Sequence, residues 1–275
     1  MKVLGVDISE HNGSVNFNAL KSYGVKFVII RCGFGSDYVN QDDSRFEENV
    51  KGAELAGLPW GVYLYSYAKN PSMASSEAQH VLRILNGRQP LYGVWYDVED
   101  PQLSSVDVVS TCVTFCEAIE SSGLYVGIYS MLSWLNGKLN SSKLDAYDKW
   151  AAQWNSVCQY EKPYGIWQFT DSLSIGGKSF DGNYAYKDYP TIIQGKDEDE
   201  MCDYKTFKLY MDRYLKELAS QSASDWAQPA IEKCKSLSIM NGDADGKFRP
   251  CSYLTRQEAA QVALNIFNAL GGGDK

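Results

Sequence analysis

The residues best suited to chemistry are two carboxylates separated by one position, Asp97 and Glu99, in the run Trp-Tyr-Asp-Val-Glu-Asp at 95–100. On a β-strand they point to the same face, because side chains alternate with a period of two. Cleavage of a glycosidic bond uses one protonated carboxyl as general acid and a second group that stabilises the cationic transition state. A negative neighbour raises the pKa of the acid, which suits that role. The pair indicates a site of this kind, and an exposed acidic strand end is the structural alternative.

The same alternation places further polar side chains on the inner faces of other expected strands. Asp7 lies opposite the apolar side chains of strand 3–9, and Arg31 lies opposite those of strand 26–32. Asp181 falls in the last expected strand. A purely structural barrel would fill its interior with Val, Ile and Leu, so this convergence favours a functional site at one mouth. Tyrosines join it on the inner faces: Tyr63, Tyr65, Tyr67 and Tyr129.

Alternating strands and helices are expected to position these residues. Helix-like segments at 45–56, 73–85 and 106–121 separate short apolar runs, and this order predicts a parallel sheet with helical crossovers. His80 falls in the second of these helices and is expected to be solvated. The expected strands are 3–9, 26–32, 60–67, 93–99, 125–130, 149–154, 165–170 and 179–184.

The last expected strands lie too close together for helical crossovers. Only about ten residues separate each from the next, and a parallel crossover needs a dozen or more. Those connections should therefore be hairpin-like or irregular. The fold class that follows is α/β: a distorted TIM-like barrel with five βα units and a β-only closing segment.

Ordered motifs along residues 1 to about 188 resemble the family 25 glycoside hydrolases. The resemblance implies this barrel and cleavage, with retention, of the β-1,4 bond between N-acetylmuramic acid and N-acetylglucosamine in peptidoglycan. No cofactor and no metal are expected. The matching segments are Gly-Val-Asp-Ile-Ser at 5–9, His-Asn-Gly at 11–13, Phe-Val-Ile-Ile-Arg at 27–31, Asp43 with Phe46, Asn49 and Ala53, Gly-Val-Tyr-Leu-Tyr at 61–65, Asp-Val-Glu at 97–99, Gly-Ile-Tyr at 127–129, Trp154, Trp-Gln-Phe at 167–169 and Asp-Gly-Asn at 181–183.

The resemblance also implies roles for individual residues. It makes Glu99 the general acid with Asp97 beside it, and Asp7 and Asp181 match the other carboxylates of the family's site. Either Asp97 attacks the sugar directly, or the substrate's own acetamido group does so while Asp97 orients it. The expected substrate contacts are Tyr63, Tyr65, Tyr129, Trp154 and Gln168, to which the inner-face argument adds Arg31.

The character of the chain changes after about residue 190. A barrel over 1–190, an acidic linker over 191–203 and a helical module over 204–275 are expected, with an amphipathic helix at 204–218. The module resembles a single surface-layer homology repeat, through motifs such as Leu-Thr-Arg-Gln-Glu at 254–258. Arg256 would then bind an anionic wall polymer. Because such repeats usually occur in threes, a lone copy predicts self-association into a homo-oligomer; a packing appendage is the alternative.

Charge and hydrophobicity limit the kinds of partner that the protein is expected to bind. The net charge is −8, from 26 basic and 34 acidic residues, and the chain has no Lys/Arg-rich tract. Both features argue against nucleic acid as the main partner. No stretch approaches the ~18 apolar residues of a membrane helix, and no signal peptide is visible at the N-terminus. We therefore expect a phage endolysin that is made in the host cytoplasm and reaches the wall at lysis. An exported autolysin and a barrel that grips wall glycan without cutting it are the alternatives.

Overall fold

The computed structural model describes residues 2–195, 204–243 and 246–271. The chain divides into two compact units, residues 1–199 and 200–275. No helix among these described residues is long and apolar enough to cross a membrane.

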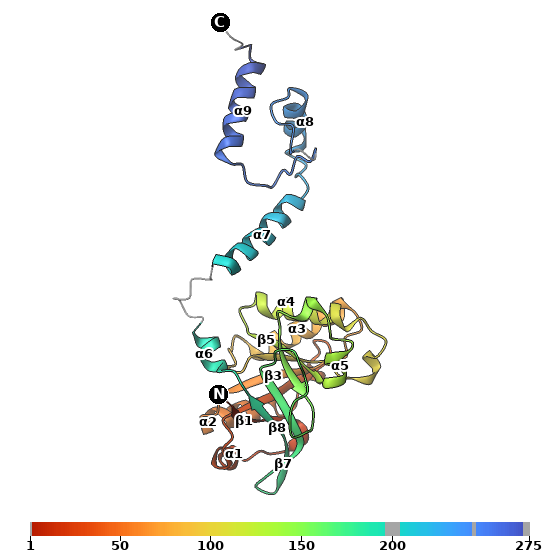
Figure 1. Ribbon diagram of the computed structural model, residues 1–275, viewed down its shortest axis with the longest axis vertical. Coiled ribbons are helices and arrows are strands. Elements are labelled where there is room, and N and C mark those ends of the chain that lie inside the picture. The colour runs from red at the N-terminus through yellow and green to blue at the C-terminus, as the bar shows by residue number, and fades with distance from the viewer. Residues whose placement is uncertain (1, 196–203, 244–245, 272–275) are drawn as a thin grey trace. The chain divides into compact units, whose positions relative to one another are not determined.

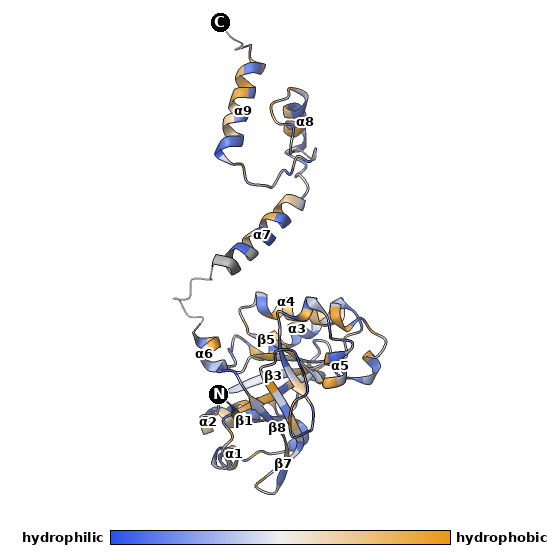
Figure 2. Ribbon diagram, viewed as in Figure 1, coloured by the Kyte–Doolittle hydropathy of each residue, from blue (hydrophilic) through white to orange (hydrophobic). Residues whose placement is uncertain are grey.

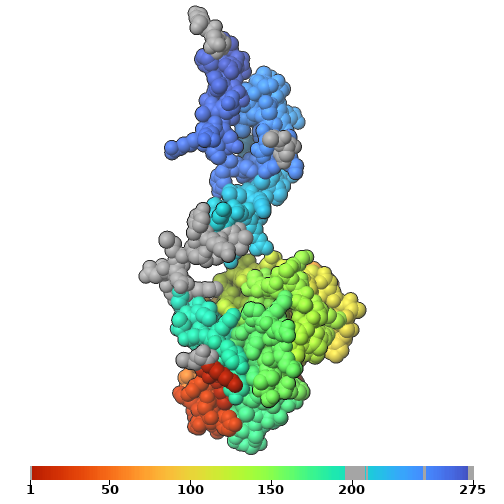
Figure 3. Space-filling view, in the orientation of Figure 1, coloured from red at the N-terminus to blue at the C-terminus, as the bar shows by residue number. Residues whose placement is uncertain are grey.

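The first unit is a closed barrel of eight strands that pair in chain order (Figure 1). Strands β1 to β7 run parallel, and β8 is antiparallel to both β7 and β1. Figure 3 shows the closure from outside, where the red N-terminal segment meets the blue-green segment that ends the barrel. The strands are β1 Val3–Ile8, β2 Phe27–Phe34, β3 Trp60–Tyr65, β4 Val94–Asp97, β5 Val126–Met131, β6 Asp148–Ala152, β7 Ile166–Ile175 and β8 Lys178–Ala185.

Five helices follow the first five strands, which confirms the five βα units. Side chains that favour N-caps begin three of the helices, since Asn16, Asn70 and Asp107 each accept a hydrogen bond from a backbone N–H of the first turn. Gly57 ends α2 in the left-handed conformation, with φ 64°. The helices are α1 Phe17–Tyr23, α2 Phe46–Ala56, α3 Pro71–Leu85, α4 Val108–Ser121 and α5 Leu132–Asn136.

The closing segment is β-only, as the short spacing predicted. An irregular loop without a helix joins β6 to β7, which still pair in parallel. A tight hairpin joins β7 to β8, and its two turn residues Gly176 and Gly177 have φ of 59° and 80°, a region that glycine adopts without strain.

The barrel interior changes character along its axis. On β2, Phe27 and Ile29 point inward near the amino end, and Arg31 follows them at the carboxyl end. On β4, Trp95 precedes Asp97 in the same way. Aromatic and aliphatic side chains thus fill the lower interior, while polar side chains remain at the mouth where barrel active sites form. The outer faces of the strands pack against the helices in a second apolar layer.

The sequence-based domain boundary at residue 190 cuts through a helix of the barrel. Helix α6, Tyr189–Gln194, continues the first unit. Tyr189 is fully buried, and its hydroxyl donates to the Asp148 carboxylate over 2.7 Å. Residues 191–194 of the expected linker are therefore helical, and its residues 196–203 lie outside the described part of the chain.

The expectation of a solvated His80 is wrong. The side chain is fully buried, and its ring nitrogens lie 3.0 Å from the Gly35 carbonyl oxygen and 2.8 Å from Asp42 Oδ1. Helical spacing alone could not reveal this, because both partners come from the segment that follows β2.

The second unit contains α7 Tyr204–Ser220, α8 Gln228–Ser236 and α9 Arg256–Ala269. A capping box formed by Thr255 and Glu258 begins α9. In Figure 2 parts of the α7 and α9 ribbons carry the colour of hydrophobic residues, and several of the large apolar side chains described there are exposed. None of the described side chains of this unit is buried. Exposed examples are Tyr210, Trp226, Tyr253, Leu264, Phe267 and Leu270.

Candidate active site

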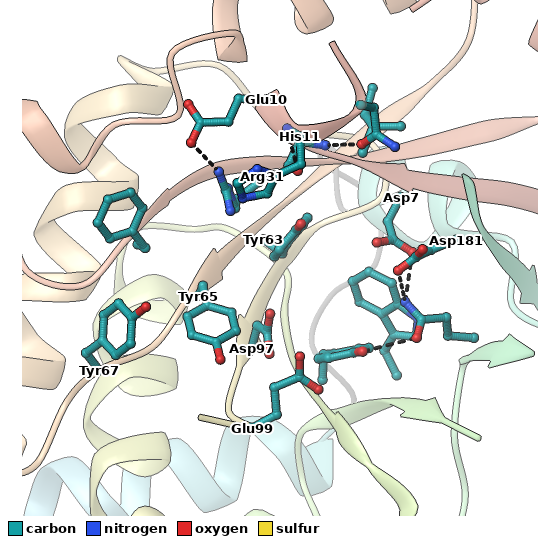
Figure 4. Close-up of a pocket in the computed structure, with 17 residues that line it drawn as sticks. Asp7, Glu10, His11, Arg31, Tyr63, Tyr65, Tyr67, Asp97, Glu99 and Asp181 are labelled. Carbon is teal, nitrogen blue, oxygen red and sulfur yellow. Dashed lines mark hydrogen bonds and ion pairs between the residues drawn. The ribbon is translucent and has the colours of Figure 1, made fainter. Parts of the chain in front are cut away.

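A cleft of about 630 Å³ opens at the carboxyl ends of the barrel strands. All four carboxylates predicted from the sequence line it. Figure 4 shows them as two pairs, Asp97 beside Glu99 and Asp7 beside Asp181. A second hollow of about 530 Å³ shares Glu99 and Asp181 with the cleft and is also lined by Trp154. The structure therefore brings the four predicted carboxylates together at one mouth of the barrel.

Strand β4 and its continuation position the first pair. Asp97 ends β4 on the inner face, and the N–H of Val98 donates to the carbonyl of Tyr129 over 3.0 Å. Beyond this pairing, Glu99 lines the same cleft as Asp97. Asp97 is buried, and its Oδ1 has no hydrogen-bond partner among the described residues.

Burial sets the protonation behaviour of this pair. Desolvation raises the pKa of Asp97 well above its usual value, and the nearby Glu99 carboxylate raises it further. Desolvation also raises the pKa of Glu99, and the nearby Tyr129 hydroxyl acts in the opposite direction. Ionising one carboxyl makes the other harder to ionise, so the pair is suited to hold one proton at a pH where free carboxyls have lost theirs.

The closure of the barrel positions the second pair. Asp7 on β1 and Asp181 on β8 stand opposite each other in the antiparallel register. Asp7 Oδ2 accepts hydrogen bonds from Asn183 Nδ2 at 2.7 Å and from Gln168 Nε2 at 3.0 Å. Desolvation, followed by repulsion from Asp181, raises the pKa of Asp7 well above its usual value. Desolvation raises the pKa of Asp181 to about 6.

Tyrosines and one arginine line the cleft on the side of β2 and β3. Tyr63, Tyr65 and Tyr67 alternate inward, and the Tyr65 hydroxyl donates to Asp100 over 3.1 Å. Arg31 also lines the cleft, where Nε donates to Asp43 and Nη2 donates to Glu10, each over 2.8 Å. Two carboxylates thus hold the guanidinium in place.

The remaining predicted contacts lie on the side of β5 to β7. Tyr129 and Gln168 line both hollows, and Trp154 lines the second one with 62% of its surface exposed. An exposed indole face is suited to stack on a sugar ring. Arg256, the one predicted site residue outside the barrel, is exposed at the start of α9.

Glu10 and Trp150 are among the lining residues that the sequence did not indicate. Glu10 lines the cleft and forms an ion pair with Arg31. It lies beyond the end of β1, so the alternation of side chains along a strand could not place it. Trp150 lines the floor, and its Nε1 donates to Asn183 Oδ1 over 2.7 Å. The alternation of Trp150 with Ala152 on β6 was a signal that could have found it.

Two pairs of carboxyls in a cleft at the carboxyl mouth of a closed α/β barrel, bordered by aromatic rings, define a site of the glycoside hydrolase class. The sequence profile of glycosyl hydrolases family 25 matches residues 6–178, and the chain belongs to this family. A second profile, that of the S-layer homology domain, matches residues 219–260.

Named relatives agree with this membership. The chain is 33% identical over 177 residues to an autolytic lysozyme of Clostridium acetobutylicum, a match that covers 64% of this chain and 52% of that protein. It is 28% identical over 200 residues to lysozyme M1 of Streptomyces globisporus, covering 65% of each chain. The chain thus spans about half of the first relative and less than two thirds of the second.

Solved structures show the same fold. The catalytic domain of endolysin ply40, from bacteriophage P40 of Listeria monocytogenes, is 28% identical, with a TM-score of 0.60 over 71% of this chain and 98% of that one. The modular autolysin LytC of Streptococcus pneumoniae is 26% identical, with a TM-score of 0.60 over 67% of this chain and 47% of that one.

Proposed function

We propose that the protein is a muramidase that cleaves the β-1,4 bond between N-acetylmuramic acid and N-acetylglucosamine in peptidoglycan, with retention of configuration. The observation that carries this proposal is the convergence of Asp97 and Glu99, with Asp7 and Asp181, in one cleft. Lysozymes among the relatives support the substrate class, as does LytC, whose structure has been solved with a synthetic peptidoglycan ligand.

In the proposed mechanism Glu99 donates its proton to the glycosidic oxygen, so that the leaving sugar departs as a neutral alcohol. Positive charge then develops at the anomeric carbon beside the Asp97 carboxylate. Either Asp97 attacks that carbon, or it orients the acetamido oxygen of the substrate for the attack. Water next attacks the intermediate and gives its proton to the Glu99 carboxylate, which restores the acid. The exposed Trp154 and the cleft tyrosines supply faces on which sugar rings can stack.

Digestion of purified peptidoglycan tests the bond specificity. After digestion the new reducing ends are identified by mass spectrometry. Muramic acid ends are expected, and glucosamine ends would overturn the proposal. If no ends form at all, the barrel grips the glycan without cutting it.

Proton NMR of early products tests retention. The β-anomer should accumulate first, because two successive displacements restore the starting configuration. An initial α-anomer would contradict this mechanism.

We also infer a phage endolysin, made in the host cytoplasm and released to the wall at lysis. The likeness to the endolysin of bacteriophage P40 supports this, while the autolysins among the relatives support the bacterial alternative. Sequencing the genomic neighbourhood separates the two: phage structural genes are expected beside this gene, and a position among bacterial chromosomal genes would favour the autolysin.

The second unit is proposed to bind an anionic wall polymer, which the S-layer homology match supports. Arg256 is exposed there, and a guanidinium donates to carboxylate or phosphate through a fixed fork of N–H groups. Pull-down with purified cell walls should weaken in Arg256→Ala and stay unchanged in Lys216→Ala, which removes an exposed charge from α7. Unchanged retention of Arg256→Ala would remove this residue from the site.

A further inference from the structure

Gln168 is the most fully bonded side chain of the cleft. It lies on β7 with only 2% of its surface exposed, although it lines both hollows. Its Oε1 accepts from the Tyr129 hydroxyl at 3.1 Å and from Trp154 Nε1 at 3.2 Å. Its Nε2 donates to Asp7 Oδ2 at 3.0 Å and to Asp181 Oδ2 at 3.2 Å.

The orientation of this amide is determined by its neighbours. An indole N–H can only donate, so the atom that faces Trp154 must be the amide oxygen. The carboxylates of Asp7 and Asp181 accept, so the atom that faces them must be the amide nitrogen. A primary amide has two acceptor lone pairs and two N–H donors, and all four are used within the protein.

We propose that Gln168 is a positioning residue that makes no hydrogen bond to the substrate and instead holds Asp7 and Asp181 in register with Tyr129 and Trp154. This role rests on the glycosidase function proposed above, and it differs from the substrate contact that the sequence resemblance implies for this residue. Through one rigid amide, the exposed ring of Trp154 is tied to two carboxyls beside the reacting atoms.

The amide also influences which form these carboxyls take. Its N–H groups lower the pKa of Asp7, in opposition to desolvation and to repulsion from Asp181. The other acidic groups around the pair act against its ionisation: Asp97 and Glu99 at the end of β4, and Asp171 on β7. Tyr63 on β3 and Tyr129 on β5 are neutral because their pKa values are raised. The Arg31 guanidinium lines the same cleft and lowers the pKa of Asp97.

Removing the amide should therefore have a signature in the pH profile. In Gln168→Met, which keeps the length of the side chain, the pKa values of Asp7 and Asp181 rise. The acid limb of kcat/KM against pH should move to higher pH. Turnover should fall by roughly 10- to 100-fold, because displaced groups lose their alignment. KM should stay within about twofold, since no substrate hydrogen bond is lost.

The experiment measures hydrolysis of purified peptidoglycan by the parent, Gln168→Met, Gln168→Glu and Gln89→Met across the pH range. Gln89 is exposed and lines none of the hollows described above, so its variant should match the parent. Gln168→Glu keeps the shape and places a third carboxyl beside Asp7 and Asp181, so its acid limb should move further in the same direction. This variant decides the question if Gln168→Met fails to fold.

The outcomes separate the two proposals. An inactive parent would defeat the muramidase function itself. An active parent with a tenfold rise in KM and an unmoved acid limb in the Gln168 variants would overturn the positioning role and restore the substrate contact. An active parent with a raised limb and an unchanged KM supports the positioning role.

Discussion

At the scale of the residue, burial gives the two carboxyl pairs of the cleft, Asp97 with Glu99 and Asp7 with Asp181, their chemistry. Glu99 is half-buried, Asp97 is buried, and the pKa of each is raised chiefly by desolvation. Buried carboxyls of this kind reduce the stability of the folded protein when they ionise, and they are typical of functional sites. Two predictions separate the catalytic contribution of these residues from their cost to stability.

Glu99→Gln should keep the fold and lose nearly all hydrolysis. The change removes the proton donor while conserving shape, and general acid catalysis is worth about 10²–10⁴-fold. Clearing of cell-wall suspensions measures the rate. A variant that clears walls within a few-fold of the parent would show that Glu99 is not the acid.

Asp97→Asn should lose activity but gain stability at neutral pH. The pKa of Asp97 is higher in the folded protein than in the unfolded chain. The parent therefore loses stability as the pH rises from about 4, where the carboxyl ionises in the unfolded chain, to the pKa of the folded protein. The free energy of unfolding of Asp97→Asn should therefore exceed that of the parent at pH 7, and the gain should vanish near pH 4. Each tenfold difference in the acid dissociation constant between the folded and unfolded chains corresponds to about 1.4 kcal/mol.

Denaturant titrations followed by tryptophan fluorescence at pH 4 and pH 7 measure this difference. Asp212→Asn, an exposed position on α7, is the matched control and should behave as the parent at both values. An Asp97→Asn variant that is less stable than the parent at pH 7 would contradict the interpretation.

At the scale of the element, α3 anchors the two strands that carry the site. Glu77 on α3 is fully buried behind β3 and β4. It accepts hydrogen bonds from the Tyr67 N–H at 2.8 Å, from Ser66 Oγ at 2.8 Å and from the Tyr96 hydroxyl at 2.5 Å. Tyr96 immediately precedes Asp97, and Tyr67 lines the cleft. One carboxyl thus holds the ends of both strands.

Glu77→Ala should destabilise the barrel by about 3 kcal/mol or more, because it leaves several buried donors without an acceptor. Glu54→Ala, an exposed change of the same type on α2, should cost less than about 0.5 kcal/mol. Thermal unfolding of both variants measures the difference. Equal melting temperatures would show that the three hydrogen bonds contribute nothing net.

At the scale of the whole molecule, the second unit leaves several large apolar side chains exposed. Phe267 on α9 has 59% of its surface exposed, and Trp226 has 84%. The unit has one S-layer homology match, and none of its described side chains is buried in a core. These facts support the expected homo-oligomer, in which copies of this unit cover one another's apolar faces.

Light scattering on the full chain at micromolar concentration should therefore give a mass above that of one chain. Phe267→Glu should reduce the mass, because a charge within an apolar interface is costly. Gln261→Glu adds the same charge to a polar position of α9 and serves as the control. A monomeric parent would defeat the oligomer.

The sequence by itself determined which face of each strand a residue occupies. Period-two alternation placed Asp7, Asp97 and Tyr129 inward, and the short final spacings predicted the β-only closure, because both depend only on local geometry. Local rules could not supply contacts between distant segments. The antiparallel return of β8 sets Asp181 opposite Asp7, and β7 brings the Gln168 amide between them. Likewise the burial of His80 and the docking of α6 depend on partners far along the chain. Hydrogen-bond partners and burial were decided by the tertiary structure, since closing the barrel is what brings these groups together.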